Sequence, residues 1–496
     1  MATLLIPVQQ PLQPPLPTIE GNVDYRELRD QLLRIDQLLT QSQIEHQFIA
    51  KTFEQWKAKV RFKNIPAKAQ LHIQIHARRA LRCNILRSLI KEDFRGFAVR
   101  LADSPLFQHF CGLSELGKVK TPAKSTLQRY SQWSDEATLA DLIHQLNQHA
   151  HQHPGKLQLR RKLDLQTYFL DSTCLKSNIH YPVDWVLLRD GTRTLIKAIK
   201  LIRQEGLRHR MPEPAVFLKE MNGLCIKMTH SRLLSDSKKQ RKKLFRAMDK
   251  LIKQVATHAQ RYRQILDQQW EQTQWTRGEV DYILKRMDNV LDQLPKARQQ
   301  ARQRIIKEQQ VLSKDKILSL YEPDAQVIVR NKAGAEVEFG NTLLLGEAPS
   351  GVIVDWKLFK EVAPNDARLV VSSLKRTQEN LGVQIQALGA DRAFDSESNR
   401  MALKKRKIYN GICPREPHQL KQKKKSWKFN QLQHRRAQSE GRIGILKNAF
   451  LGTPHRSKGF ENRQLALSWI ILTHNLWVIA RLPRRKARTK SQLKAA

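Results

Sequence analysis

Apolar residues recur every three or four positions through most of the first third of this chain, a spacing typical of helices. The pattern runs from Tyr25 to Val60 and again from Leu71 to about Gln148. We therefore expect residues 1–70 to form a flexible leader followed by the first helices. We expect residues 71–160 to form an all-α region.

The pattern changes at Leu163, where an apolar run reaches Leu170 and stops at Asp171. A short apolar run of this kind is typical of a buried strand, so residues 161–186 should contain the first strand of a sheet. Helical spacing then returns and predicts a long helical insertion over residues 187–320.

Two apolar stripes lie inside this helical stretch. One joins Leu244 to Ile265 in alternating steps of four and three residues. The second runs from Ile283 to Leu294 and should end at Pro295, because proline interrupts helical hydrogen bonding. The two stripes predict an antiparallel helical hairpin whose apolar faces pack together.

Strand patterns return in the second half of the chain. Strands are predicted at Ala325–Arg330, Glu336–Leu345 after a turn at 331–334, Gly351–Trp356, Val383–Leu388 and Tyr409–Cys413. Helices are predicted from Asp366 to Leu381, from Ser396 onward and around Glu440. The fold class is therefore α/β, with a mixed-sheet core over residues 161–186 and 321–480 and a basic tail over residues 481–496.

Charge narrows the range of partners. The chain has 88 Lys and Arg against 46 Asp and Glu, which gives a net charge of +42. A field of this size attracts polyanions, so we expect nucleic acid or an anionic surface as a partner. The tail over residues 481–496 carries seven Lys and Arg and no acid, which predicts a flexible nucleic-acid-binding segment.

Cysteine spacing and hydropathy indicate a reducing, aqueous compartment. The five cysteines are widely spaced and form no Cys-x-x-Cys pair, which argues against a disulfide framework and a zinc ribbon. Met1–Thr18 has no basic segment before an apolar run, so we expect no signal peptide. No uninterrupted apolar stretch reaches about 18 residues, so we expect no membrane span and a cytoplasmic protein.

Residues 121–130 look like a turn followed by a short basic helix. Such a segment can be the second helix of a helix-turn-helix, in which Lys124 and Arg129 would face DNA. It can equally be an ordinary connection between helices. Residues 71–160 are therefore the candidate DNA-binding region.

Two of the predicted strands end in an aspartate, Asp171 and Asp391, and a later helix carries the glutamate Glu440. Strand ends meet at the edge of the sheet where α/β sites form, so the two aspartates can converge there. Three converging carboxylates repel unless a cation neutralises them, and oxygen ligands suit Mg²⁺. Taken singly, Asp171 can be a helix cap and Asp391 a turn residue. Together with Glu440 they predict a Mg²⁺ site capable of phosphodiester chemistry.

Glu440 is the only acid among nine Lys and Arg over residues 421–450. At 3.6 residues per turn, Gln433, Arg436, Glu440 and Lys447 fall within roughly 60° on the helix surface. A carboxylate on a basic face can hold a divalent cation next to phosphates. The alternative is a solvated helix with an Arg–Glu pair one turn apart.

These residues resemble the three acidic motifs of bacterial insertion-sequence DDE transposases. The first motif is matched by Asp171-Ser172-Thr173 with residues 178–184, the second by residues 390–395 around Asp391, and the third by Arg436-x3-Glu440-x6-Lys447. The third motif usually begins with a tyrosine, and this chain has Gln433 at that position. The likeness covers about residues 75–480, and the nearest group is the loosely classified ISNCY insertion sequences.

The resemblance implies an RNase H-like catalytic core interrupted by the helical insertion. Asp171, Asp391 and Glu440 would be the catalytic metal ligands, with Mg²⁺ as cofactor and Mn²⁺ able to substitute. Arg436 and Lys447 would contact phosphates of the transposon ends, and Arg442 is a further predicted DNA contact. The family cuts the terminal inverted repeats of its own element and joins the 3′ ends to target DNA. Double-stranded DNA, a homodimer on paired ends and association with the bacterial nucleoid are the expectations that follow.

Three alternatives remain open. The first is an RNase H-like nuclease on the same core, and the second is a catalytically idle DNA-binding protein derived from a transposase. The third is an RNA-binding or ribosome-associated protein, which the charge permits. The chain has no aromatic strand pair of the RNP type to favour it, and its Gly441-Arg442-Ile443-Gly444 belongs to the predicted Glu440 helix and not to a KH-type loop.

Overall fold

The structure is a computed structural model that describes residues 16, 18–59, 65–115, 118–233, 235–332, 335–452 and 454–485. The predicted leader over residues 1–20 and the basic tail over residues 481–496 lie mostly outside the described residues. The predicted turn at residues 331–334 lies partly outside them.

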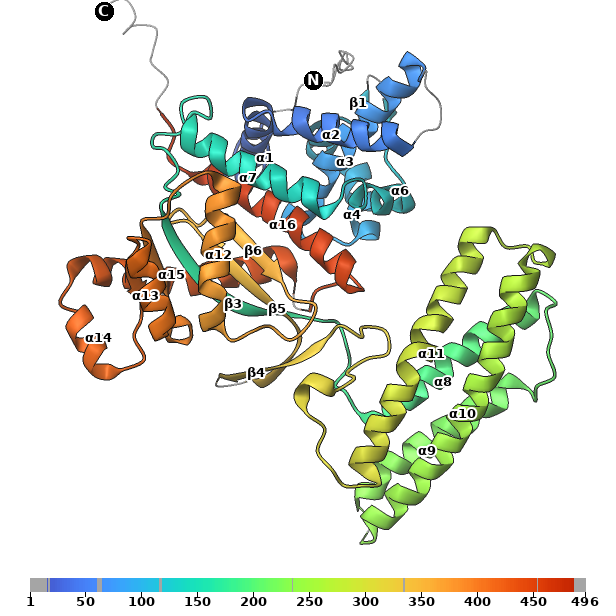
Figure 1. Ribbon diagram of the computed structural model, residues 1–496. Coiled ribbons are helices and arrows are strands. Elements are labelled where there is room, and N and C mark those ends of the chain that lie inside the picture. Colours follow the sequence, from blue (N-terminus) through green and yellow to red (C-terminus); the bar gives the residue numbers. More distant parts are fainter. Residues whose placement is uncertain are drawn as a thin grey trace, which may run out of the picture.

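Helices precede the sheet in the chain, and their bounds agree with the apolar spacing. They are α1 (Val23–Gln41), α2 (Ile44–Lys59), α3 (Ala67–Leu89), α4 (Phe94–Asp103), α5 (Pro105–Cys111), α6 (Lys124–Ser131) and α7 (Glu136–Gln152). A short hairpin that the pattern did not predict, β1 (Ser114–Glu115) with β2 (Lys118–Val119), lies between α5 and α6. Figure 1 shows these helices gathered with the C-terminal helix α16 (Phe460–Arg481) on one side of the sheet.

The sheet is mixed, which confirms the predicted α/β class. Its strands are β3 (Thr167–Lys176), β4 (Gln326–Lys332), β5 (Ala335–Glu347), β6 (Ile353–Leu358), β7 (Ala387–Ala390) and β8 (Tyr409–Ile412). β3 pairs antiparallel with β5 on one side and parallel with β7 on the other, and β8 adds in parallel beyond β7. β5 is long enough to pair with β4 along its first half and with β6 along its second.

β3 is longer and β7 is shorter than the sequence predicts. The expected strand end at Asp171 is wrong, because β3 continues to Lys176 and pairs with β5 as far as Gly340. The pairing register of β3 with β5 explains why residue 340 is a glycine, since a Cβ there would lie 2.1 Å from the carbonyl oxygen of Leu175. β7 begins at Ala387 and not at Val383.

A helix covers each face of the sheet. Successive side chains of a strand point to opposite faces, so Tyr168 and Phe169 of β3 mark the two sides. Tyr168 shares a hydrogen bond of 2.6 Å with Ser373 of α12 (Asp366–Leu381). Phe169 packs against Leu432 of α15 (Trp427–Ile445) on the other face. The helices α13 (Glu397–Lys405) and α14 (Pro417–Lys423) flank β8 in the chain.

The N-terminal helices and the sheet share one hydrophobic core. The buried cluster runs without a break from the N-terminal helices through β3, β5, β6 and α12 to α16. The Asn147 side chain of α7 donates to the Ile353 carbonyl of β6 at 3.0 Å and so joins the two parts. Trp469 Nε1 of α16 donates to the Ser131 carbonyl of α6 at 3.0 Å and joins the C-terminal helix to the N-terminal ones. The N-terminal region therefore packs as part of the core structure.

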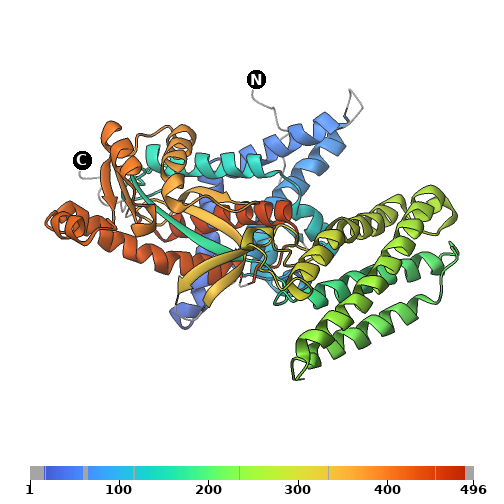
Figure 2. The same ribbon diagram turned by 60° about the horizontal axis from the view of Figure 1, so that its bottom comes forward.

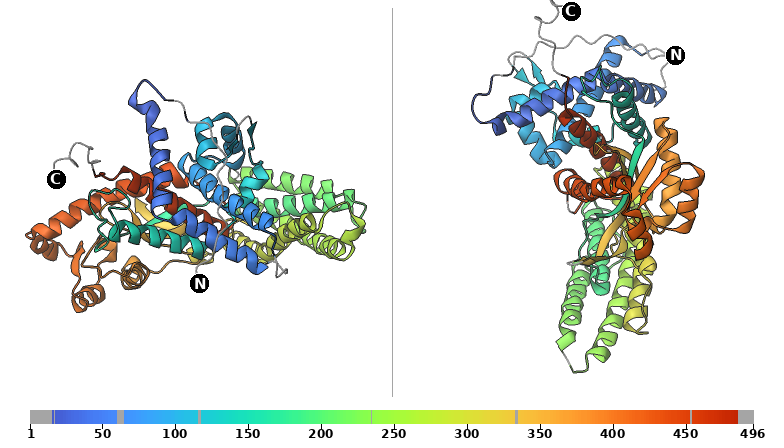
Figure 3. Two further views of the ribbon diagram at one scale, coloured as in Figure 1. Left: turned by 90° about the horizontal axis from the view of Figure 1, so that it is seen from above. Right: turned by 90° about the vertical axis from the view of Figure 1, so that its left-hand side faces the viewer.

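The helices between β3 and β4 form a separate bundle. They are α8 (Asp184–Gln204), α9 (Pro214–His230), α10 (Ser237–Gln269) and α11 (Arg277–Ile305), and they bury their own cluster of apolar side chains. Figures 1 and 2 agree that this bundle, drawn in green and yellow, projects away from the sheet. The right-hand view of Figure 3 shows the same separation.

The predicted hairpin is present, with two differences. The buried stripe of α10 is rotated by about one residue, since Phe245 and Ile252 are buried while Leu244 and Ile265 are only partly buried. The predicted helix end at Pro295 is wrong, because α11 passes through this proline to Ile305. The turns after Pro295 bury Ala297, Ala301 and Ile305 in the bundle, and this packing outweighs the single hydrogen bond that proline removes.

Candidate active site

The two aspartates predicted to converge are neighbours on adjacent strands. Parallel pairing of β3 with β7 ends at the pair Leu170–Ala390. The next residue is Asp171 in β3 and Asp391 directly after β7. Neighbouring strands lie about 4.8 Å apart. β3 continues past Asp171, but from this residue onward it pairs with β5 alone. The sheet edge at the ends of the β3–β7 pairing therefore still begins at Asp171.

Asp171 lies on the sheet face that α15 covers, and its surroundings disfavour its charge. Burial raises the pKa of Asp171 to about 6. The Ser172 backbone N–H, which donates to Asp171 Oδ1 at 2.7 Å, and the Arg436 guanidinium oppose this rise in pKa. The negative charges of Asp391 and Glu440 add to it. Asp391 and Glu440 therefore each lie within electrostatic reach of Asp171.

Asp391 holds the turn that follows β7. Its Oδ1 accepts a hydrogen bond of 2.8 Å from the Ala393 N–H and caps the short helix Arg392–Phe394. The turn role considered from the sequence is thus present in the structure. It fixes the carboxylate at the strand end beside Asp171.

Glu440 lies at the border of the helix face that packs on the sheet. Its neighbour Ser439 is buried, whereas the Glu440 side chain is 66% exposed and lies 3.9 Å from Arg436 Nη1. Within the described ranges, no group of three His, Cys, Asp or Glu side chains is placed to hold a metal ion. In this conformation Glu440 pairs with Arg436, as the alternative interpretation of the helix describes.

Gln433 is a site residue whose contacts the sequence did not predict. Its Nε2 donates to the Gly411 carbonyl at 2.6 Å and to the Ala390 carbonyl at 3.3 Å, which are backbone groups of β8 and β7. Its Oε1 accepts from Arg436 Nε at 3.3 Å. One side chain therefore ties α15 to the strand that leads into Asp391 and holds the arginine that pairs with Glu440.

Lys447 reaches the sheet from beyond the end of α15. The α-helix changes to a π-helix over Leu446–Leu451, a feature that the sequence did not predict, and Lys447 lies near its start. Lys447 Nζ donates a hydrogen bond of 3.2 Å to Thr173 Oγ1. Thr173 lies two residues after Asp171 and on the same sheet face, so the ammonium lies over the strand that carries the first acid.

Arg442, a predicted DNA contact, faces the protein. Its Nη1 donates to the Pro349 carbonyl at 3.4 Å, and burial lowers the pKa of its guanidinium. Gly351 makes room for the Arg442 side chain, because a Cβ at residue 351 would overlap it. The backbone at Gly351 also has a φ of +91°, which favours glycine. Arg442 therefore braces α15 against the loop after β5.

A fourth acid lies on the same sheet face. Glu347 ends β5 opposite Phe169, and its carboxylate pairs with Arg435 at 3.0 Å and accepts a hydrogen bond from the Ser439 hydroxyl. A cavity of about 20 Å³, the room of a single water molecule, is lined by Asp171, Glu347 and Arg442 among others. Glu347 lies in Leu-Gly-Glu-Ala-Pro, which resembles a turn, so only the register of β5 identifies it.

The short basic helix that was predicted to face DNA is α6. Lys124 and Arg129 are both exposed on α6, which packs on α3 through a hydrogen bond of 2.8 Å from the Asn84 side chain to the Tyr130 carbonyl. The connection before α6 spans residues 112–123 and includes the hairpin of β1 and β2. A helix-turn-helix has a turn of about 3–4 residues, so this element of the prediction is wrong.

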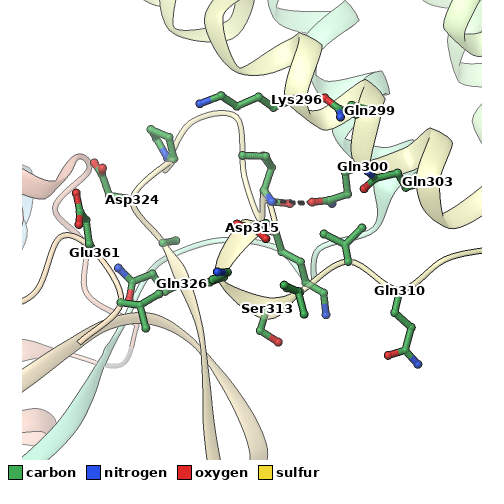
Figure 4. A pocket seen from close by; sticks show the side chains of 18 of the residues that line it. Lys296, Gln299, Gln300, Gln303, Gln310, Ser313, Asp315, Asp324, Gln326 and Glu361 are labelled. Atoms are coloured by element: carbon green, nitrogen blue, oxygen red, sulfur yellow. Dashed lines mark hydrogen bonds between the residues drawn. The ribbon is translucent and has the colours of Figure 1, made fainter. Parts of the chain in front are cut away.

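A larger cleft lies at the joint between the bundle and the sheet. It has a volume of about 960 Å³ and lies between α11, the segment 310–317 and β4. Figure 4 shows it lined by Gln299, Gln303 and other amide side chains, and one wall is held by Gln300 Oε1 accepting from the Ile317 N–H at 2.7 Å. None of the predicted acids lines it.

Comparison with known proteins returned no match among family models, curated proteins or solved structures. All five cysteines are free, and four of them are buried. Across the helices in the described ranges, none is long and apolar enough to cross a membrane.

Proposed function

We propose that this protein is a DNA transposase of the DDE type. It would bind the terminal inverted repeats of its own element, cut the DNA at their ends and join the 3′ ends to target DNA. The observation that carries this proposal is the strand register, which makes Asp171 and Asp391 neighbours beneath the helix that bears Glu440.

The order of the strands supports the RNase H-like part of the proposal. An RNase H-like core begins with three antiparallel strands and then adds parallel strands on the other side of the first. β3, β5 and β6 have the first arrangement, and β7 and β8 have the second. The bundle α8–α11 then corresponds to a helical insertion after the first strand.

The acids fit an oxygen-liganded divalent cation. Asp171 is ionised only at the cost of burying its charge, and a cation would relieve the repulsion from Asp391 and Glu440. When bound, Mg²⁺, or Mn²⁺ in its place, activates a water or 3′-hydroxyl and stabilises the leaving oxygen of a phosphodiester. Asp171 and Asp391 would hold it from the sheet, and Glu440 would complete the set by leaving Arg436.

The basic residues around the acids would hold the DNA backbone. Arg436 is freed for a phosphate when Glu440 turns away, and Lys447 already lies over the strand of Asp171. A guanidinium can grip a phosphate with two hydrogen bonds, whereas an ammonium acts as a point charge. Lys124 and Arg129 on α6 would contact the transposon end. Arg442 would act indirectly, by bracing α15.

The net charge of +42 supports double-stranded DNA as the partner. A homodimer on paired transposon ends, in the bacterial nucleoid, completes the proposal. A catalytically idle DNA-binding protein is the second candidate, and the ion pair between Glu440 and Arg436 favours it.

The experiment is a cleavage and strand-transfer assay with the inverted repeats that flank the reading frame. Asp171→Ala, Asp391→Ala and Glu440→Ala should each abolish cleavage and leave end binding largely intact, while the exposed Glu397→Gln on α13 serves as a matched control. Arg436→Ala and Lys447→Ala should weaken end binding and lower its salt slope by about one ion each. Arg436→Lys should also weaken end binding, because an ammonium cannot grip a phosphate with two hydrogen bonds. End binding without cleavage by the unaltered protein would support the idle candidate.

A further inference from the structure

A row of cations runs along one side of α10 in the bundle. Positions 239, 243, 246, 250 and 253 are separated by alternating steps of four and three residues and hold Lys, Lys, Arg, Lys and Lys. At 100° per residue these five positions fall within an arc of roughly 80°. We call these five residues the α10 basic stripe.

The stripe faces solvent and lies opposite the buried side of the helix. All five side chains are exposed. The buried side of α10 is formed by Phe245, Met248, Ile252, Val255 and Ala259 among others, which lie about half a turn around the helix. From position 239 to position 253 the stripe extends for about 21 Å at 1.5 Å per residue.

Acids are absent from this arc over the whole of α10, which the structure describes completely. Asp249, on the flank of the stripe, pairs with Lys253 at 3.2 Å and with Arg298 of α11 at 2.7 Å. Glu308 pairs with Lys238 and Lys242, which lie outside the arc. The other four cations of the stripe make no ion pair with any residue that the structure describes. Among the described residues no acid relieves the repulsion between these four cations, so they attract counterions from solution.

The chemistry of this surface distinguishes between polyanions. A helix that binds an anionic membrane inserts an apolar face into it, and the apolar face of α10 is buried in the bundle. A straight row of cations without aromatic side chains suits the phosphates of a duplex rather than the stacked bases of a single strand. The occupant that fits is therefore double-stranded nucleic acid.

We propose that the α10 basic stripe is a second DNA-binding surface, which holds the phosphate backbone of a duplex away from the three acids. The choice of DNA rests on the function proposed above. Because the bundle projects from the sheet (Figure 1), a duplex held there is contacted outside the site of cleavage. The contacts are to phosphates, so the surface binds DNA without reading its sequence.

The test is binding of the full-length protein to duplex DNA, measured by fluorescence anisotropy over a range of salt concentrations without divalent metal. The stripe variant combines Lys239→Gln, Lys243→Gln, Arg246→Gln and Lys250→Gln. The control variant combines Lys219→Gln, Lys227→Gln, Lys285→Gln and Arg302→Gln, which are exposed cations spread over α9 and α11. Both variants lower the net charge by four, from +42 to +38.

The stripe variant should lower the salt slope of binding by about three to four, at about 0.9 per phosphate contact, and the control variant by less than one. Replacing Lys239, Lys243 and Lys250 by arginine should preserve the salt slope of binding. Equal losses in both variants would overturn the proposal, because the effect would then be net charge alone. The proposal would also be overturned if the stripe variant lost binding only to single-stranded RNA or only to vesicles of anionic phospholipid. Because no cleavage is measured, the result is independent of whether the three acids are catalytic.

Discussion

The N-terminal helices and the helical bundle are both α-helical, yet they relate to the sheet in opposite ways. The N-terminal helices share a continuous core with it, and the Asn147 side chain donates a hydrogen bond across that contact. The bundle α8–α11 buries its own apolar cluster and projects from the sheet. Periodicity in the sequence finds helices of both kinds but does not show which of them can fold without the sheet.

The largest effect should come from separating these regions. A fragment of residues 184–320 contains all four bundle helices and their cluster, so it should unfold cooperatively in urea, as followed by circular dichroism. A fragment of residues 1–160 should not fold, because Ile353, Trp469 and their neighbours supply part of its core. Cooperative unfolding of the 1–160 fragment would contradict this comparison. So would a 184–320 fragment that shows no cooperative unfolding.

The site depends on both sides of its own contact between helix and sheet, and Gln433 tests this. Gln433→Leu keeps the size of the side chain but removes its bonds to Ala390, Gly411 and Arg436. Residues that orient metal-site groups typically contribute 10–100-fold, so cleavage should fall by about that factor, with a higher Mg²⁺ requirement.

The matched control is Gln438→Leu on the exposed side of the same helix. It should leave both the cleavage rate and the Mg²⁺ requirement unchanged. A Gln433→Leu protein with the metal dependence of the original would show that Gln433 only packs α15.

A smaller effect concerns stability. The pKa of Asp171 is raised to about 6 from 3.8, so the folded state holds this proton more tightly than the unfolded state. The contribution is favourable below about pH 4 and is lost as pH rises through about 6. Asp171→Asn should therefore be more stable than the original by about 1–2 kcal/mol at about pH 7.5, and by nothing at about pH 4. Urea unfolding at both pH values measures it, and an equal change at both would exclude the charge as its cause.

The residues that could be predicted share a local signal. Asp171 and Asp391 each follow an apolar run, and two parallel strands bring such positions together. The continuation of β3 to Lys176 could not be predicted, because its partner in β5 lies more than 150 residues later. Glu347 was missed for the same reason.

Other differences arise where packing overrides local preference. The bundle core carries α11 through Pro295, and α15 is followed by a π-helix over Leu446–Leu451. These outcomes depend on neighbours that no window of sequence contains.

The proposed function requires that Asp171, Asp391 and Glu440 hold a divalent cation together. Calorimetric titration of Mn²⁺ into the protein bound to its end DNA measures this binding. Mn²⁺ binding should be weakened in Asp171→Asn, Asp391→Asn and Glu440→Gln by more than the roughly 10–100-fold typical of residues that only orient metal ligands. It should be unchanged in Glu397→Gln. The same Mn²⁺ affinity in all of these proteins would contradict it.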